Sequence, residues 1–267
     1  MCIKSFESHL KKRKLAPNSI ASYLYAVNYF LNNYNKDLES LLEYKGYLVD
    51  NFKPKTVNSR IQALNAYLKF IDQQDLVLQA VKVQSKPFLE NVISYPDYLF
   101  LKRKLRADDN LRWHFIVWFL GATGARVGEL LKFKVEHVHS GYFDIYSKGG
   151  KFRRIYIPKR LRDACLAWLT TENRATGYLF LNKKGDTITT RGVARQLKTY
   201  AEKYGIPTQV IYPHSFRHMY AKRFLDKHSD IALLADLLGH ESIETTRIYL
   251  RKTASEQQAL VDKIVTW

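Results

Sequence analysis

The segment Leu238-Gly-His240-Glu-Ser-Ile-Glu-Thr-Thr-Arg-Ile-Tyr249 places a histidine nine residues before a tyrosine. Two upstream segments carry matching polar groups, Ala122-Thr-Gly-Ala-Arg126-Val-Gly-Glu129 and His214-Ser-Phe-Arg217. Arginine stays protonated and binds phosphate oxygens through a planar fork of N–H groups. A phenol, with a pKa of about 10, needs such positive charge to attack a phosphodiester at neutral pH. In this order the segments indicate a site that holds a phosphodiester and attacks it with Tyr249.

Each segment alone has an ordinary structural explanation. The chain holds 18 tyrosines, and a tyrosine on an amphipathic helix usually belongs to the core. Arg126 and Glu129 are three residues apart, the spacing of a surface ion pair worth a few tenths of a kcal/mol. The same spacing also lets the Glu129 carboxylate orient a neighbouring side chain. The set as a whole favours the phosphodiester site.

His214 and Arg217 follow Pro213 at an expected helix start, so that one helix face presents a titratable base beside a fixed cation. His214 and His218 have the spacing of a pair of metal ligands, but no matched third ligand follows. We therefore expect no metal and no cofactor. His218 is expected to pack in the core or to support the site.

Release of a 5′ oxygen from a phosphodiester requires a proton from a general acid. Lys148 and Lys151 flank two glycines in a turn between two expected strands, 142–146 and 151–157. From the tip of a hairpin, Lys148 can reach into a DNA minor groove and supply that proton. Lys151 is the alternative donor and a candidate DNA contact, and solvated turn lysines are the ordinary explanation for both.

The charge of the chain favours a polyanionic partner. Among its 267 residues, 43 are Lys or Arg and 25 are Asp or Glu, which gives a formal net charge of +18. Each phosphate neutralised by such a protein releases counterions, so the excess is typical of nucleic-acid binding. A soluble basic protein without that role is the alternative.

The two cysteines, Cys2 and Cys165, lie far apart in the sequence, so neither a disulfide framework nor a cysteine-based metal site is expected. The longest apolar run, Phe115–Leu120, is far shorter than the roughly 20 residues of a membrane span. The N-terminus has no stretch of the signal-peptide type. These features predict a cytoplasmic protein with no membrane partner.

Residues 1–74 have the apolar periodicity of four helices, which predicts a small helical domain. The segment 75–94 lacks clear periodicity and is expected to be a linker. Basic residues on the polar faces of the helical domain are candidate DNA contacts, although for each one a solvated helix surface is an equal alternative. These candidates are Lys11, Lys12, Lys14, Lys53, Lys55 and Arg60.

Residues 95–252 predict a second domain dominated by helices, with one small antiparallel element between them. The fold class is thus mainly α with a small antiparallel β element (α+β). Gly239 is expected just past a helix end, which places His240 on the turn that follows. Helices are expected at 95–106, 110–122, from 126, at 160–170, 190–204, 214–227, 230–238 and 243–249.

These motifs resemble, in order and in spacing, the set of the tyrosine recombinase (phage integrase) family. The motifs are Ala-Thr-Gly-Ala-Arg126-Val-Gly-Glu129-Leu-Leu, Ser-Lys148-Gly-Gly-Lys, His214-Ser-Phe-Arg217-His-Met and Leu-Gly-His240 followed by Tyr249. Chance assembly of all four is far less probable than a match to any one. The helical N-terminal segment resembles the core-binding (SAM-like) domain of the family, so the resemblance covers nearly the whole chain.

The resemblance implies a role for each group. Arg126 and Arg217 would bind the scissile phosphate, and His240 would donate a hydrogen bond to it. Lys148 would be the general acid for the 5′-hydroxyl and His214 the acid/base partner of the tyrosine. Tyr249 would form a 3′-phosphotyrosyl bond, supported by Glu129. The chain begins with core-binding helices, without the arm-binding domain of the large phage integrases, so a compact Xer-like integrase or invertase is expected.

The resemblance also implies double-stranded recombination sites as partners, clamped between the two domains, and a tetramer of protomers in the synaptic complex. The tail, 253–267, would dock on a neighbouring protomer or fold back on its own domain. Two other functions are compatible with the chemistry. One is relaxation of DNA by a type IB topoisomerase, and the other is DNA binding by a catalytically silent protein.

Overall fold

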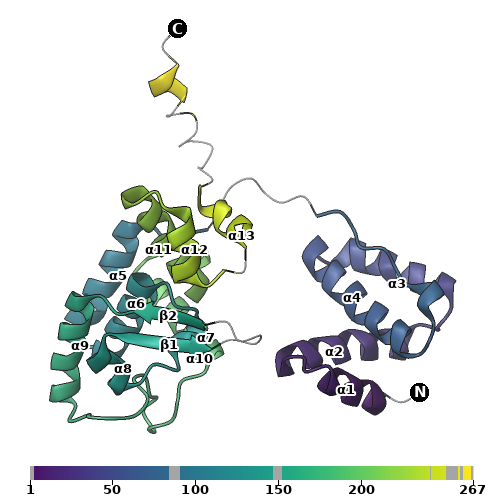
Figure 1. Cartoon of the computed structure of the whole chain (residues 1–267), viewed down its shortest axis with the longest axis horizontal. Helices are drawn as coiled ribbons and strands as arrows, with labels where there is room; N and C mark the ends of the chain where they lie inside the picture. The colour runs from purple at the N-terminus through teal and green to yellow at the C-terminus, as the bar shows by residue number, and fades with distance from the viewer. Residues whose placement is uncertain are drawn as a thin grey trace. The chain divides into compact units, whose positions relative to one another are not determined.

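The structure is a computed structural model of the whole chain. It describes residues 3–83, 91–146, 152–240 and 242–250, and, in the tail, residues 258, 261–265 and 267. The chain divides into two compact units, a first unit of residues 1–85 and a second unit of residues 86–267 (Figure 1). The described residues are mostly helical, with a two-stranded antiparallel sheet, which confirms the predicted fold class.

The first unit is a four-helix domain closed by one 3-10 turn. Phe6, Tyr44 and Tyr67 are among its fully buried side chains, and the aromatic rings of Phe6 and Tyr67 meet edge to face at 5.3 Å. Such packing supplies the apolar burial that holds short helices together in water. The elements are α1 (Ile3–Lys12), α2 (Pro17–Asn33), α3 (Leu38–Asn51), α4 (Pro54–Phe70) and η1 (Gln74–Leu76).

The helix starts of the first unit follow from local sequence. Pro17 and Pro54 occupy the first turns of α2 and α4, where the missing N–H costs nothing. Asp37 caps α3 by accepting a hydrogen bond from the Ser40 N–H at 2.8 Å.

The segment 77–83, expected in the linker, packs on the first unit because two asparagines of α4 bind its backbone. Asn65 donates to the Leu78 carbonyl at 2.8 Å and accepts from the Leu78 N–H at 2.9 Å. Asn58 makes the same pair of bonds with Val81, at 2.9 and 2.8 Å. Leu78 is also buried in the core of the first unit, so the segment is held by amide hydrogen bonds and by single apolar contacts, which produce no helical periodicity.

The second unit is built around α6, whose apolar residues are buried on all sides of the helix. It packs against α5, α9 and α11. The helices before and after the hairpin are α5 (Tyr95–Ala107), α6 (Leu111–Thr123), α7 (Val127–Leu130), α8 (Val135–Ser140), α9 (Lys159–Thr171), α10 (Thr190–Lys203), the turn η2 (Thr208–Val210), α11 (Pro213–Lys227), α12 (Ile231–Leu238), α13 (Ile243–Arg247) and the turn η3 (Ile248–Leu250). The short helix α8 was not predicted.

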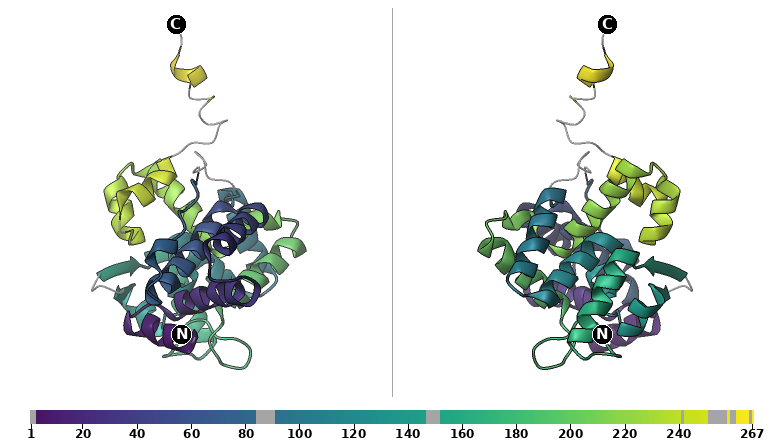
Figure 2. Two further views of the ribbon diagram at one scale, coloured as in Figure 1. Left: turned by 90° about the vertical axis from the view of Figure 1, so that its right-hand side faces the viewer. Right: turned by 90° about the vertical axis from the view of Figure 1, so that its left-hand side faces the viewer.

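The hairpin consists of β1 (Tyr142–Tyr146) and β2 (Phe152–Tyr156), paired antiparallel with Ile145 opposite Arg153. Alternate residues of β2 face inward, so that Arg153 and Ile155 are buried while Phe152 and Tyr156 are exposed. Both views of Figure 2 show the hairpin on the same side of the second unit as α11, α12 and α13. The contacts between β2 and α12 bring strand and helix ends together at the site.

Candidate active site

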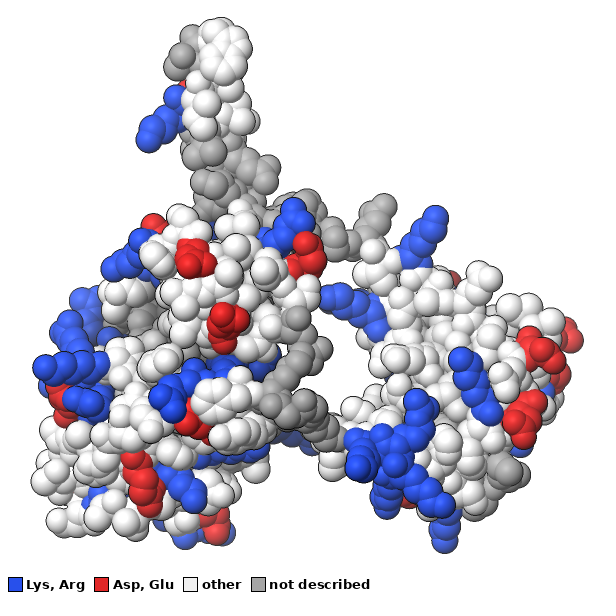
Figure 3. All heavy atoms as spheres, viewed as in Figure 1, with Lys and Arg blue, Asp and Glu red and all other residues white. Residues whose placement is uncertain are grey.

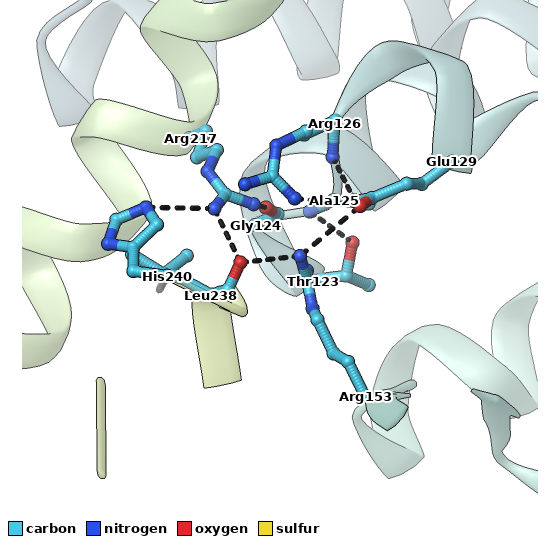
Figure 4. Close-up of polar contacts among 9 residues, drawn as sticks. All are labelled: Thr123, Gly124, Ala125, Arg126, Glu129, Arg153, Arg217, Leu238 and His240. Carbon is cyan, nitrogen blue, oxygen red and sulfur yellow. Dashed lines mark hydrogen bonds and ion pairs between the residues drawn. The ribbon is translucent and has the colours of Figure 1, made fainter. Parts of the chain in front are cut away.

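Among the charged side chains that the structure describes in the second unit, Arg217 is the most enclosed, with 1% of its surface exposed. Its Nη1 donates to the Gly124 carbonyl at 2.8 Å, and its Nη2 donates to the Leu238 carbonyl at 2.6 Å and to His240 Nε2 at 3.0 Å (Figure 4). Burial, with the charges of Arg126 and Arg153, lowers the pKa of Arg217 to about 10. At neutral pH it remains a cation, fixed between the ends of two helices.

Gly124 and Gly239 make these helix ends. Each has a left-handed backbone, with φ of +61°, and each ends a helix, α6 and α12 respectively. Carbonyls in the last turn of a helix lack partners within the helix. Arg217 supplies the missing donors, which explains why helix termini and a cation meet at this point.

Arg126 lies just before α7 and is exposed, unlike Arg217. Its backbone N–H donates to Glu129 Oε2 at 2.7 Å, and its side-chain Nη1 donates to Glu129 Oε1 at 2.9 Å. The expected ion pair therefore forms, and it orients a guanidinium at the rim of the site. The Arg126 side chain is 44% exposed, so a phosphate can approach it.

Arg153 is a member of the site that the sequence analysis missed. Its side chain, 9% exposed, donates from Nη1 to Glu129 Oε1 at 3.3 Å and to the Leu238 carbonyl at 2.5 Å. The signal in the sequence is its place on the strand, because it shares a face with Ile155, which is buried. An arginine on the buried face of a strand indicates a specific set of acceptors.

Gly239→Ala is expected to lower the free energy of unfolding of the second unit by more than the cost of a left-handed backbone at a non-glycine residue. A Cβ at this position would lie 2.4 Å from Arg153 Cδ, and the backbone strain of a non-glycine residue costs about 1–2 kcal/mol. All four tryptophans belong to the second unit, so urea unfolding followed by tryptophan fluorescence measures its stability.

The matched control is Gly205→Ala. Gly205 has φ of +67°, but nothing lies within 4 Å of a Cβ there, so only the backbone cost applies. Equal losses of unfolding free energy in the two variants would contradict the packing of Arg153 on Gly239.

His240 is held as a neutral ring between Arg217 and a buried threonine. Arginine has donors only, so His240 Nε2 accepts from Arg217, and Nδ1 carries the proton that is donated to Thr246 Oγ1 at 2.7 Å. Burial, together with the charges of Arg217 and Arg126, lowers the pKa of His240 to about 4. If a bound phosphate accepted the hydrogen bond from Arg217 Nη2, His240 Nε2 would lose this donor and would need another partner.

Tyr249 lies in η3, with 4% of its surface exposed, and packs with residues of α11 and α12. Its ring stacks on His240 at 6.2 Å between centroids and contacts His218 at 5.4 Å. Burial raises the pKa of the phenol, while the neighbouring Arg217 and the charge of Arg126 oppose that rise. The tyrosine is thus a core residue by burial and also a neighbour of the cations.

His218 and His214 extend the cluster along α11. The centroids of their rings are 4.5 Å apart. The His218 ring in turn contacts the ring of Tyr249. Burial, aided by nearby positive charges, lowers the pKa of both, in the case of His218 to about 4. His214 is exposed, so it is open to a substrate.

Acidification is expected to destabilise the second unit between pH 6.5 and about 4. The pKa values of His218 and His240 are lowered from 6.5 to about 4, so in this window the unfolded chain binds protons that the folded chain does not. The free energy of unfolding therefore falls as the pH falls. Because both rings are partly open to solvent, we expect a loss of roughly 2 kcal/mol for the pair.

The same tryptophan-monitored urea unfolding at pH 7 and at about pH 4.5 measures this loss. A double variant, His218→Gln with His240→Gln, should have a smaller difference between the two pH values. An undiminished difference in that variant would show that other groups cause the acid sensitivity.

A cleft of about 710 Å³ opens beside these residues. Arg126, Glu129, Arg153 and His240 line one part of it, and side chains of the hairpin and of α12 line the rest. The cleft thus gives solvent access to the exposed rim of the arginine cluster.

The structure brings together six of the eight residues predicted for the site by sequence, with the exposed His214 at the edge. The six are Arg126, Glu129, Arg217, His218, His240 and Tyr249. Lys148 and Lys151 lie outside the described residues. Within the described ranges no group of three or more His, Cys, Asp or Glu side chains is arranged to hold a metal ion.

The candidate DNA contacts of the first unit have different surroundings. Lys12, Lys14, Lys53 and Lys55 are exposed, and Lys11 pairs with Glu7 at 2.5 Å. Arg60 is partly buried, with its guanidinium 3.9 Å from the Phe52 ring centroid. On the face in view in Figure 3, basic side chains gather over α1 and α2.

The model of the phage integrase family matches residues 87–256, more than half of the chain. The chain belongs to the phage integrase family. Members of this tyrosine recombinase family are enzymes that cleave and rejoin DNA strands, and the match spans all eight residues predicted to be catalytic or supporting. No helix in the described ranges of this family member combines the length and the apolar character needed to cross a membrane.

Relatives of this phage integrase family member cover nearly its whole length. Tyrosine recombinase XerA of Thermococcus kodakarensis is 31% identical, over 98% of this chain and 97% of the relative. Its counterpart from Pyrococcus furiosus is 29% identical, over 98% and 93%. The fold is that of the Tn1549 transposon integrase solved with transposon right end DNA, with a TM-score of 0.71 at 14% identity and full coverage of both chains.

Proposed function

We propose that this chain is a site-specific DNA recombinase that acts through a 3′-phosphotyrosyl bond to Tyr249. The observation that carries the proposal is the position of a phenol beside a buried guanidinium and between two imidazoles. Two arginines with fixed orientation, Arg126 and Arg217, match the two charged oxygens of a phosphodiester. The XerA relatives, named as tyrosine recombinases, support the same function.

The proposed reaction conserves the number of phosphoester bonds. The Tyr249 oxygen forms a bond to phosphorus while the bond from phosphorus to the 5′ oxygen breaks. The phenol proton passes to a base, for which exposed His214 is the candidate, and the 5′ oxygen takes a proton from Lys148. Attack by a 5′-hydroxyl reverses the step, so the chemistry needs neither ATP nor a metal.

We propose that the two units clamp double-stranded DNA. The net charge of +18 supports a polyanionic partner. Exposed Lys12, Lys53 and Lys55 are candidates for phosphate contacts, which fix position without reading sequence. By its substrate, the protein would act at the nucleoid.

We propose four protomers in the active complex. Exchange between two duplexes breaks four strands, and each protomer carries one Tyr249. In the tail, Val261, Ile264 and Trp267 are exposed, which supports docking on another protomer. Mass photometry of the protein with a DNA site tests this, and a complex with fewer than four protomers that still exchanges strands would contradict it.

The experiment that tests the function is capture of covalent adducts. Protein is incubated with fragmented DNA of the source genome, denatured and purified, and the attached DNA ends are sequenced. We expect a small set of paired inverted sequences, each with protein on the 3′ phosphate. The absence of adducts would indicate a silent DNA-binding protein, whereas adducts at scattered sequences would indicate a topoisomerase.

A further inference from the structure

Arg153 links the two arginines proposed to bind phosphate. It shares the acceptor Glu129 Oε1 with Arg126, at 3.3 and 2.9 Å, and the Leu238 carbonyl with Arg217, at 2.5 and 2.6 Å. Figure 4 shows the resulting line of hydrogen bonds, in which the Arg153 guanidinium lies between the two acceptors. The two shared acceptors come from α7 and α12, while Arg153 comes from β2.

Stability does not explain an arginine at this position. Its Nε and Nη2 are buried and have no hydrogen-bond partner within the described protein. Burial lowers the pKa of Arg153 although the Glu129 carboxylate opposes that change, and the charge of Arg126 lowers it further. Buried ion pairs contribute little net stability, and without Arg153 the Glu129 carboxylate keeps the donor Arg126 and the Leu238 carbonyl keeps the donor Arg217.

We propose that Arg153 is a positioning residue, which sets the separation and orientation of Arg126 and Arg217 for the scissile phosphate. Through Arg153 the strand β2 is anchored to Glu129 and to the end of α12. The position of β2 thereby determines the spacing of the phosphate-binding arginines. This inference rests on the proposed function.

The test uses the full chain and a nicked oligonucleotide duplex built on a site recovered by adduct capture. Loss of the nicked fragment traps the phosphotyrosyl adduct, and its single-turnover rate is measured. Since a misplacement of about 1 Å in an active site can cost about 100-fold, Arg153→Met should slow adduct formation by about that factor. The affinity for the duplex, measured in a Tyr249→Phe background, should change by less than about threefold.

Arg112→Met is the matched control. Arg112 is also partly buried, donates to a backbone carbonyl, that of Leu181 at 2.9 Å, and has a buried Nε without a partner. It lies at the opposite end of α6 from Gly124 and should leave the rate unchanged. Arg153→Lys, which keeps a cation on a shorter side chain without the planar fork, should recover about tenfold of the rate lost in Arg153→Met and remain about tenfold slower than the wild-type protein.

A methylphosphonate at the scissile position separates positioning from a general loss of structure. The methyl group removes the negative charge of the phosphate, so correct placement of the two guanidiniums matters less. The deficit of Arg153→Met should shrink to less than about tenfold on this substrate, relative to the wild-type protein on the same substrate. Tryptophan-monitored unfolding confirms that the variants compared are folded.

Equal rates for Arg153→Met and Arg112→Met would overturn the positioning role. The same conclusion follows from a deficit of equal size on both substrates, or from a deficit in DNA affinity alone. If Arg153→Met does not fold, Arg153→Lys provides the test. A wild-type rate of adduct formation in Arg153→Lys would then overturn the positioning role. A wild-type protein that forms no adduct would instead overturn the proposed function, on which this inference rests.

Discussion

A Tyr249→Phe variant is expected to form no covalent adduct with DNA and to exchange no strands. The substitution removes the single oxygen that attacks phosphorus in the proposed reaction and leaves the ring in place. Because the ring packs with residues of α11 and α12, the variant should remain folded. Adduct formation on the nicked duplex, resolved on a denaturing gel, provides the measurement.

Tyr212→Phe is the control for this prediction. Tyr212 immediately precedes α11, and its phenol is close enough to influence the pKa of Tyr249. It is therefore a second phenol near the site, and its removal should leave adduct formation intact. An adduct that persists in Tyr249→Phe and disappears in Tyr212→Phe would reassign the nucleophile.

An Arg217→Met variant is expected to lose about 1000-fold or more in the rate of adduct formation. Removal of one fixed donor from a developing oxyanion costs about 100- to 1000-fold, and Arg217 supplies both a fixed charge and donors. Arg217→Lys should recover little activity, because one ammonium cannot reach Gly124, Leu238 and His240 together as the guanidinium does. Single-turnover rates on the nicked duplex measure both variants.

Arg217→Met should also destabilise the second unit, by roughly 2–4 kcal/mol, because the Gly124 carbonyl and His240 Nε2 lose the donor Arg217 and the Leu238 carbonyl keeps only Arg153. Rates are therefore compared at a urea-free condition where tryptophan fluorescence reports a folded protein. Arg223→Met is the control on the same helix, since the Arg223 guanidinium stacks on Tyr95 at 4.1 Å and makes no contact with the cluster. Wild-type rates in folded Arg217→Met would refute its role at the phosphate.

Periodicity and turn residues predicted most of the fold. The glycine at the end of α12 and the proline at the start of α11 lie where the sequence placed them. The helix α8 was missed because six residues are too few to establish a period of 3.6. The hold of Asn58 and Asn65 on the segment 77–83 was missed because an amide binds a backbone of any sequence.

The candidate site was predictable where chemistry requires a particular side chain, as for Arg126, His240 and Tyr249. It was not predictable where the partner is a backbone carbonyl. Arg153 and the Leu238 carbonyl are 85 residues apart in the sequence, and no residue type marks position 238 as an acceptor. Thr246, which orients His240, was missed because its hydroxyl is equally typical of an ordinary helix.

The carbonyl end of α12 has an electrostatic consequence. The C-terminus of a helix carries a partial charge of roughly −0.5, spread over its last carbonyls, which attracts cations without neutralising them. It thereby reduces the mutual repulsion of Arg153 and Arg217, which both donate to Leu238. A carboxylate in the same place would cancel a full unit of positive charge and compete with an incoming phosphate. With this half unit and the single Glu129 carboxylate opposite three arginines, the cluster keeps a net attraction for an anion.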